Sequence, residues 1–249
     1  AVARAIARVR ERVPDVIVDD VVIDAAIGSE IRAAYQTIAA LEDLELPPGT
    51  LLPEALEVRH RSRIALAFRL LEIRHPAATI RLVCANLDSE SKAARANAIE
   101  VVDNVLGKDE SRLLMPLLED HPRAAKVRLG AEMFPIERAS AAAWIERLLS
   151  DPHPWIVACT LHLVREQSRV ALRARVATHL VARDPIVRET ACGTLAHLIT
   201  KHRAAATKPV EMPPELVRVV KRVATDVVAE VRLAGVALLS VVEARTHHE

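Results

Sequence analysis

Apolar residues recur at steps of three and four along most of the chain, which is the spacing that one buried helical face requires. From residue 77 onward, shorter apolar segments alternate with further apolar segments across a few polar residues. The shorter segments are residues 78–87, 111–119, 141–150, 172–182 and 215–224. The pattern predicts about five pairs of helices over residues 77–244.

An aspartate stands in the polar turn of each predicted pair. The five are Asp88, Asp120, Asp151, Asp184 and Asp226, spaced 31 to 33 residues apart except for a last interval of 42. A loop at 201–214, which contains proline and lysine, accounts for the excess. The second helix carries an arginine and, three residues later, a small residue: Arg95 and Ala98, Arg128 and Ala131, Arg188 and Ala191, Arg232 and Gly235. The third copy has Ile156 and Cys159 at these positions.

The simplest interpretation of these residues is structural. The turn Asp can cap the following helix by accepting its free backbone N–H groups. The arginine can pair with an Asp of its own turn, as Arg188 with Asp184, or with an Asp of a neighbouring repeat. The small residue lets the helix approach its neighbours. A row of ligand-binding arginines is the alternative.

Residues 1–75 do not show the repeat clearly. The β-branched runs at 16–18 and 21–23 have strand character, but 1–13 and 28–44 are patterned as helices, so we interpret the region as irregular helices with Ser29 as an N-cap. The stretch 45–53 is the clearest break. A helix is expected from there to His75, where Pro76 stops it. No domain boundary is predicted, so residues 1–249 are expected to form a single helical-repeat domain.

Composition narrows the choice of functions. Hydrophobic residues make up 51% of the chain but aromatic residues only 2%, and 6 glycines leave few turns or phosphate loops. The 34 Lys and Arg balance 33 Asp and Glu, which does not indicate a globally basic, polyanion-binding protein. Cys84, Cys159 and Cys192 lie in apolar patterns without CxxC spacing and are expected to be buried thiols in a reducing compartment. No apolar run approaches the ~20 residues that span a bilayer, and arginines interrupt the first residues, so we expect no signal peptide.

An Asp in the turn and an Arg in the second helix are the usual signature of HEAT repeats, and residues 77–244 resemble that family. The resemblance implies an all-α, HEAT-like α-solenoid of stacked antiparallel helix pairs; armadillo and related helical repeats are the near competitors. It assigns the structural signature to Asp88, Arg95, Asp120, Arg128, Asp151, Asp184, Arg188, Asp226 and Arg232. The third copy departs from the pattern because it lacks the arginine.

A narrower resemblance covers residues 51–120. The elements "RLLEIRHP" (69–76), "RANAIEVVDNVL" (95–106) and "LLMPLLED" (113–120) look like the HEAT segment of certain bacterial proteins. There the segment is appended to an ATP/ADP-carrier-like membrane domain, sometimes with a cyclic-nucleotide-binding module. The resemblance implies a cytoplasmic regulatory segment, tethered to the inner membrane through another domain. It carries over no transport activity.

No motif for catalysis, cofactor binding or metal binding emerges. The sequence has no HExxH, Walker loop, GxGxxG or GxSxG. His162, His179 and His197 fall in successive helical stretches that a stack could bring together, but no Cys or carboxylate stands at ligand spacing. Glu100 and Asp103 are spaced i, i+3 on a helix face and are expected to be solvated. We therefore expect no enzyme, no cofactor and no metal.

Nucleic-acid binding through a basic face is the alternative function. The candidate residues are Arg165, Arg169, Arg173, Arg175, Lys201, Arg203 and Lys208. Each phosphate that they neutralise would add a salt-dependent contribution to the affinity. Against this, Ser168 is expected to begin a new helix, so the arginines need not share one face, and the scarcity of aromatic residues disfavours stacking on bases.

Stacked helical hairpins present a long surface that suits recognition better than a closed reaction pocket. The expected function is a non-enzymatic interaction or scaffold domain in the cytoplasm. Its partner would be a protein or another domain of a larger chain, and this segment itself would not insert into a membrane.

The predicted register makes Ala191 a buried contact between helices. Ala191→Leu should lower the free energy of unfolding by about 1–3 kcal/mol because the added atoms overpack the contact. Denaturant titration followed by circular dichroism measures the change. An unaltered denaturation curve would show that the repeat alignment is out of register.

Overall fold

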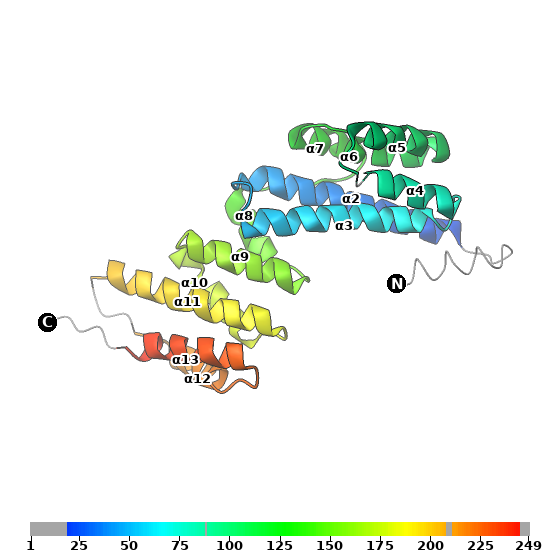
Figure 1. Ribbon diagram of the computed structural model, residues 1–249. Helices are drawn as coiled ribbons and strands as arrows, with labels where there is room; N and C mark the ends of the chain where they lie inside the picture. Colours follow the sequence, from blue (N-terminus) through cyan, green and yellow to red (C-terminus); the bar gives the residue numbers. More distant parts are fainter. Residues whose placement is uncertain (1–18, 88, 208–210, 245–249) are drawn as a thin grey trace. The chain divides into compact units, whose positions relative to one another are not determined.

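The computed structural model describes residues 19–87, 89–207 and 211–244, and all regular elements within them are helical (Figure 1). This confirms the predicted all-α class. Asp88, Lys208 and the β-branched run at 16–18 lie outside the described residues. Among the residues described, no helix has the length and apolar character needed to cross a bilayer.

Two compact units divide the chain, where the sequence predicts one continuous domain. Of the described residues, those up to 47 and those from 56 to 141 form unit 1, and those from 48 to 55 and from 142 onward form unit 2. The helices of unit 1 are α2 (Asp20–Leu44), most of α3 (Leu51–Leu71), α4 (Ala77–Leu87), α5 (Lys92–Val105), α6 (Lys108–Leu118) and α7 (Arg123–Ala131). Those of unit 2 are α8 (Ala141–Leu148), α9 (Pro154–Glu166), α10 (Arg173–Ala177), α11 (Pro185–Ala205), α12 (Pro214–Val223) and α13 (Ala229–Glu243).

Helix α2 begins eight residues before the helical stretch that the sequence marks at 28–44. Its N-cap is Asp19, whose carboxylate accepts a hydrogen bond from the Val21 N–H at 2.9 Å. The helix then continues through Ser29, so the prediction of a cap at Ser29 is wrong. The reason is that Ile23, Ile27 and Ile31 follow one another at four-residue steps on one buried face, which carries the helix across Gly28 and Ser29.

The core of unit 1 is built around two fully buried aromatic residues, Tyr35 and Phe68. The Tyr35 hydroxyl donates to the Leu113 carbonyl at 3.0 Å, which connects α2 to α6. On α7, the Tyr35 ring lies so close to Gly130 that a Cβ would not fit. Ala131 is exposed, and the expectation that it would be the small contact residue is wrong. The ring needs the smallest side chain, and glycine one residue earlier supplies it.

In unit 2 the second helices of successive pairs contact each other in order, α9 with α11 and α11 with α13 (Figure 1). Cys159, Ala191 and Gly235 are buried on these three helices, as predicted, and so is Ala98 on α5 in unit 1. A hydrogen bond from the Thr194 hydroxyl to the Leu161 carbonyl, at 3.1 Å, crosses from α11 to α9. Small residues thus allow backbone-level contact between neighbouring pairs.

The first helix of the fourth predicted pair is irregular. Instead of one helix over 172–182, α10 is flanked by two 3₁₀ segments, η1 (Val170–Leu172) and η2 (Thr178–Val181). Ser168 has a positive φ of 47° and lies in the turn before η1, so it does not begin a helix as expected. Helix α3 also ends earlier than predicted, at Leu71, and residues up to His75 form a turn before Pro76.

A substitution at Gly235 tests how closely α13 approaches the end of α12. A Cβ at this position would lie 2.7 Å from the Ala224 nitrogen and 2.8 Å from the Val223 oxygen. Because backbone atoms cannot move aside, Gly235→Ala should destabilise unit 2 by about 2–3 kcal/mol. Thermal and urea denaturation measure the change.

Gly193→Ala on α11 is the matched control. Its added Cβ would meet only the end of the flexible Arg165 side chain, at 3.6 Å. It should be neutral or stabilise the protein by about 0.5–1 kcal/mol, because alanine favours a helix interior over glycine. Equal destabilisation by the two variants would contradict the close approach at Gly235.

Candidate functional site

The strongest polar contact among the predicted signature residues joins two successive repeats. Arg188 on α11 donates from Nε to Asp226 Oδ2 at 2.9 Å and from Nη2 to Oδ1 at 3.1 Å. Both side chains are only 14% exposed. The partner of Arg188 is therefore the Asp of the next turn, and Asp184 of its own turn has another role. A two-point contact of this kind fixes both position and orientation.

The signature arginines also share a contact with their own turn. Arg188 Nη1 donates to the carbonyl of Ala182, six residues earlier, at 2.9 Å. Arg95 and Arg232 do the same, to the carbonyls of Ser89 at 2.6 Å and Asp226 at 2.7 Å. Each arginine thus satisfies a backbone acceptor of the turn before its helix. This supports a structural role for all three.

One of the predicted turn aspartates acts as a helix cap: Asp184 is the N-cap of α11, and its Oδ1 accepts from the Ile186 N–H at 3.0 Å. Asp151 and Asp226 stand two residues before the N-caps of α9 and α13. Their Oδ1 atoms accept from the N–H groups of those N-cap residues, His153 at 2.8 Å and Val228 at 3.0 Å, and so hold the turn rather than cap the helix. Asp120 is exposed.

The second copy uses a lysine in place of the predicted arginine. Arg128 is exposed on α7. Two residues earlier, Lys126 Nζ donates to the Leu117 carbonyl near the end of α6 at 2.8 Å. Burial lowers the pKa of Lys126, and the carboxylates of Asp120, Glu57 and Glu119 oppose that shift. In this copy the small contact residue is Gly130 and not Ala131, and the basic residue that bonds the preceding helix is Lys126 and not Arg128.

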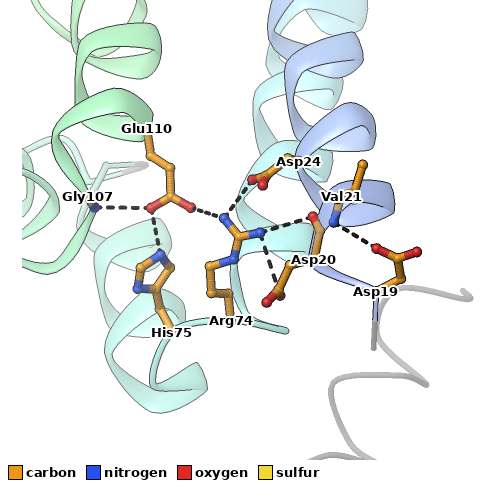
Figure 2. Close-up of polar contacts among 8 residues, drawn as sticks. All are labelled: Asp19, Asp20, Val21, Asp24, Arg74, His75, Gly107 and Glu110. Atoms are coloured by element: carbon orange, nitrogen blue, oxygen red, sulfur yellow. Dashed lines mark hydrogen bonds and ion pairs between the residues drawn. The ribbon is translucent and has the colours of Figure 1, made fainter. Parts of the chain in front are cut away.

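A polar network that the sequence does not reveal connects α2, the turn after α3, and α6 (Figure 2). Arg74 donates to Asp24 at 2.6 Å and to Glu110 at 2.9 Å. The second Glu110 oxygen lies 2.7 Å from His75 Nε2 and accepts from the Gly107 N–H at 3.1 Å. The hydrogen bonds that Arg74 donates to Asp24, foremost, and to Glu110 raise the pKa of Arg74. The network holds the turn in place and leaves no oxygen of Glu110 without a partner.

Several candidates for the basic face are engaged with the protein itself. Arg169 donates to Gln167 at 2.6 Å, and Arg175 donates to Ser150. Arg203 donates to the carbonyls of Val241 and Val242, the latter at 3.1 Å, and so binds the C-terminal end of α13. These contacts do not indicate a continuous cationic track.

The three histidines that a stack could have brought together make separate contacts. His162 lies 3.5 Å from Glu166, and His197 Nε2 lies 2.8 Å from the Ser168 hydroxyl. His179 has a buried Nε2 without a hydrogen-bond partner, and burial lowers its pKa. Within the described residues, no group of three or more His, Cys, Asp and Glu is arranged to hold a metal ion.

The contacts and pKa values of the candidate carboxylates and buried thiols do not indicate catalytic groups. These residues are Glu100, Asp103, Cys159 and Cys192. Asp103 accepts a hydrogen bond from the Ser111 hydroxyl at 2.5 Å, while Glu100 is exposed. Burial raises the pKa of the Cys159 thiol to about 11 and that of Cys192 to about 12. Thiols with such values carry little thiolate at neutral pH and are poor nucleophiles.

An apolar groove of about 650 Å³ lies in unit 2 between α10, η2, α11 and α12. We call it the α11–α12 groove. Leu195 and Ile199 form its buried floor, and Leu216 and Val219 line it from α12. Val181 is on its edge with 63% of its surface exposed. The charged groups that line the groove are Arg173 from α10, Glu211, which precedes α12, and Glu215 on α12.

Comparison of the chain with protein-family models, with curated proteins and with solved structures gave no match. The HEAT-repeat resemblance therefore stays a prediction.

The pair Arg188–Asp226 makes a testable link between pH and stability. The hydrogen bonds from Arg188, and then that from Val228, hold the pKa of Asp226 below its ordinary value. A carboxyl with a lowered folded-state pKa stabilises the fold above its unfolded pKa of about 4, and this contribution disappears as the pH falls through the folded-state pKa. The difference in unfolding free energy between wild type and Asp226→Asn should therefore be largest near neutral pH and shrink below about pH 4.

Urea titrations between pH 7 and pH 3 measure this difference. Glu189→Gln, an exposed change on the same helix as Arg188, is the control and should leave the pH dependence as in wild type. A constant difference between wild type and Asp226→Asn at all pH values would contradict the ion pair.

Proposed function

We propose that the chain is a non-enzymatic protein-interaction domain of HEAT-like repeats, and that the α11–α12 groove is its binding site for a partner. The repeat assignment is supported by the ordered contacts of α9, α11 and α13 and by the turn contacts of Arg95, Arg188 and Arg232. The groove is the observation that carries the function. Its volume is in the range of sites that bind ligands, and its lining is mostly apolar.

The occupant that fits this groove is an amphipathic helix of a partner protein. An apolar helix face covers a groove of this kind with anchor residues one turn apart. The charged lining residues favour complementary charges on such a helix: an acidic side chain would face Arg173, and a basic one would face Glu211 and Glu215. Lining charges of both signs favour one placement of the helix over its reverse.

The resemblance of residues 51–120 extends this proposal to a regulatory domain of a nucleotide-carrier-like membrane protein in the cytoplasm. The partner helix would then belong to that membrane protein or to another domain of the same chain. This extension rests on the resemblance alone.

Nucleic-acid binding is the competing function. Its test is a titration of labelled duplex at low and moderate salt, because phosphate contacts give a steep salt dependence. Duplex binding that is weakened by Arg169→Ala and Arg173→Ala would overturn the protein-interaction proposal.

Two experiments at Val181 test the groove, photo-crosslinking and the variant Val181→Asp. In the first, a photo-crosslinking residue is placed at Val181 in the full chain and irradiated in soluble and membrane extracts. The captured protein segment is identified by mass spectrometry. The segment is then synthesised as a peptide and titrated against the purified chain. Val181→Asp should weaken its binding at least about tenfold, because it brings a charge into an apolar contact.

Val227 supplies the matched control, since it is 93% exposed in the same unit and does not line the groove. Crosslinking from Val227 should not capture the segment, and Val227→Asp should bind the peptide as wild type does. Undiminished binding of the peptide by Val181→Asp would contradict the proposed site.

A further inference from the structure

A second hollow lies in unit 1, beside the residues that correspond by repeat position to an ion pair of unit 2. In the predicted repeat scheme, Arg95 and Asp120 correspond to Arg188 and Asp226. Arg188 and Asp226 form a two-point contact, but within the described residues neither Arg95 nor Asp120 belongs to an ion pair. Both instead line a cavity of about 580 Å³ between α3, α5 and the end of α6.

The cavity has an apolar body. Phe68 and Ile64 line it from α3, Ile99 from α5 and Leu117 from α6. His60 also lines it, and its Nδ1 lies 3.3 Å from the Ala34 carbonyl, so that nitrogen carries the proton and donates. Burial lowers the pKa of His60, which keeps the ring neutral at physiological pH.

Cations outnumber carboxylates among the residues that line the cavity. The two carboxylates, Glu119 and Asp120, both act on Lys126, and Glu119 also lies 2.7 Å from His121 Nε2. Three further cations line it from α3 and α5: Arg61, Lys92 and Arg95. None of these three forms an ion pair with another described residue.

The guanidinium of Arg95 is fixed at the cavity wall with N–H groups available to an anion. One of its nitrogens donates to the Ser89 carbonyl at 2.6 Å, which fixes the half-buried guanidinium at the cavity wall. Its other N–H groups have no partner among the described residues. Arg61 and Lys92 are exposed at the rim, so an incoming anion would reach them without a rearrangement of the core.

We propose that this cavity binds a small amphipathic anion, a molecule that joins a carboxylate or phosphate group to an apolar chain. The anionic group contacts Arg95, Lys92 and Arg61, and the apolar chain lies along Phe68, Ile99 and Leu117. A fork of guanidinium N–H groups matches either oxyanion, and the volume is in the range of small-molecule sites. This site is independent of the α11–α12 groove and of its proposed partner.

The full chain, labelled on its Ile and Leu methyl groups, is titrated with four probes and followed by NMR. The probes are dodecyl phosphate, dodecanoate, dodecanol and inorganic phosphate. The two anionic amphiphiles are kept below their micelle concentrations. At least one of the two anionic amphiphiles should shift the methyl signals of Ile64, Ile99 and Leu117 in a saturable way. Dodecanol and inorganic phosphate should bind about tenfold more weakly or worse, because each lacks one half of the recognition.

Comparison of dodecyl phosphate with dodecanoate distinguishes a phosphate from a carboxylate ligand. If dodecanol bound as tightly as the anionic amphiphiles, the proposed role of the cations would be overturned. If neither dodecyl phosphate nor dodecanoate gave a saturable shift, the proposed site would be overturned.

Variants separate charge from shape. Arg95→Gln should lower the affinity about tenfold or more, and Lys92→Gln should lower it in the same direction by less. Ala96→Phe, at an exposed alanine that lines the cavity, should block the site without changing its charge. Lys108→Gln and Ala93→Phe are the matched controls, since both residues are exposed in unit 1 and do not line the cavity.

Should Arg95→Gln fail to fold, Lys92→Gln and Ala96→Phe decide the result. Wild-type affinity in both of them would overturn the proposal.

Discussion

The close approach of helices at single small residues is the constraint on which both units depend. Because the chain has few aromatic residues, its core is made mostly of short aliphatic side chains, and these fill space only if the backbones come near one another. Gly130 receives the Tyr35 ring in unit 1, and Gly235 lies against the backbone of Val223 and Ala224 in unit 2. The register of α7 and α13 follows from these two contacts, and the polar contacts of the turns are built on that register.

The turn arginines solve a problem that short helical pairs create. Every helix end leaves backbone carbonyls without an intrahelical partner, and a tight turn has little room for water. Arg95, Arg188 and Arg232 each donate to a carbonyl of the turn that follows such a helix end. In Arg188 the remaining nitrogens bind Asp226, so one side chain completes its own turn and orients the next. Where the second contact is missing, at Arg95, a cavity lies in its place.

The sequence predicts those features that depend on local spacing. Helix type, the cap at Asp184, and the buried positions of Ala98, Ala191 and Gly235 follow from three- and four-residue steps. The same spacing does not distinguish Gly130 from Ala131, because both are small and only the Tyr35 ring decides between them. The Arg74 network and the α11–α12 groove are not predictable in this way. Arg74 meets Asp24 and Glu110 across 50 and 36 residues of chain, and an apolar helix face looks alike in sequence whether a neighbour covers it or not.

The buried cysteines give unit 2 an internal reporter of its opening. Cys84 is half-buried in unit 1, whereas Cys159 and Cys192 are buried on α9 and α11 of unit 2. Because burial keeps these two thiols protonated, a thiol reagent can modify them only when α9 and α11 separate. The rate of modification at Cys159 and Cys192 therefore measures a local unfolding equilibrium of unit 2, with the half-buried Cys84 as the partly accessible reference, and a ligand that binds in unit 2 would slow it.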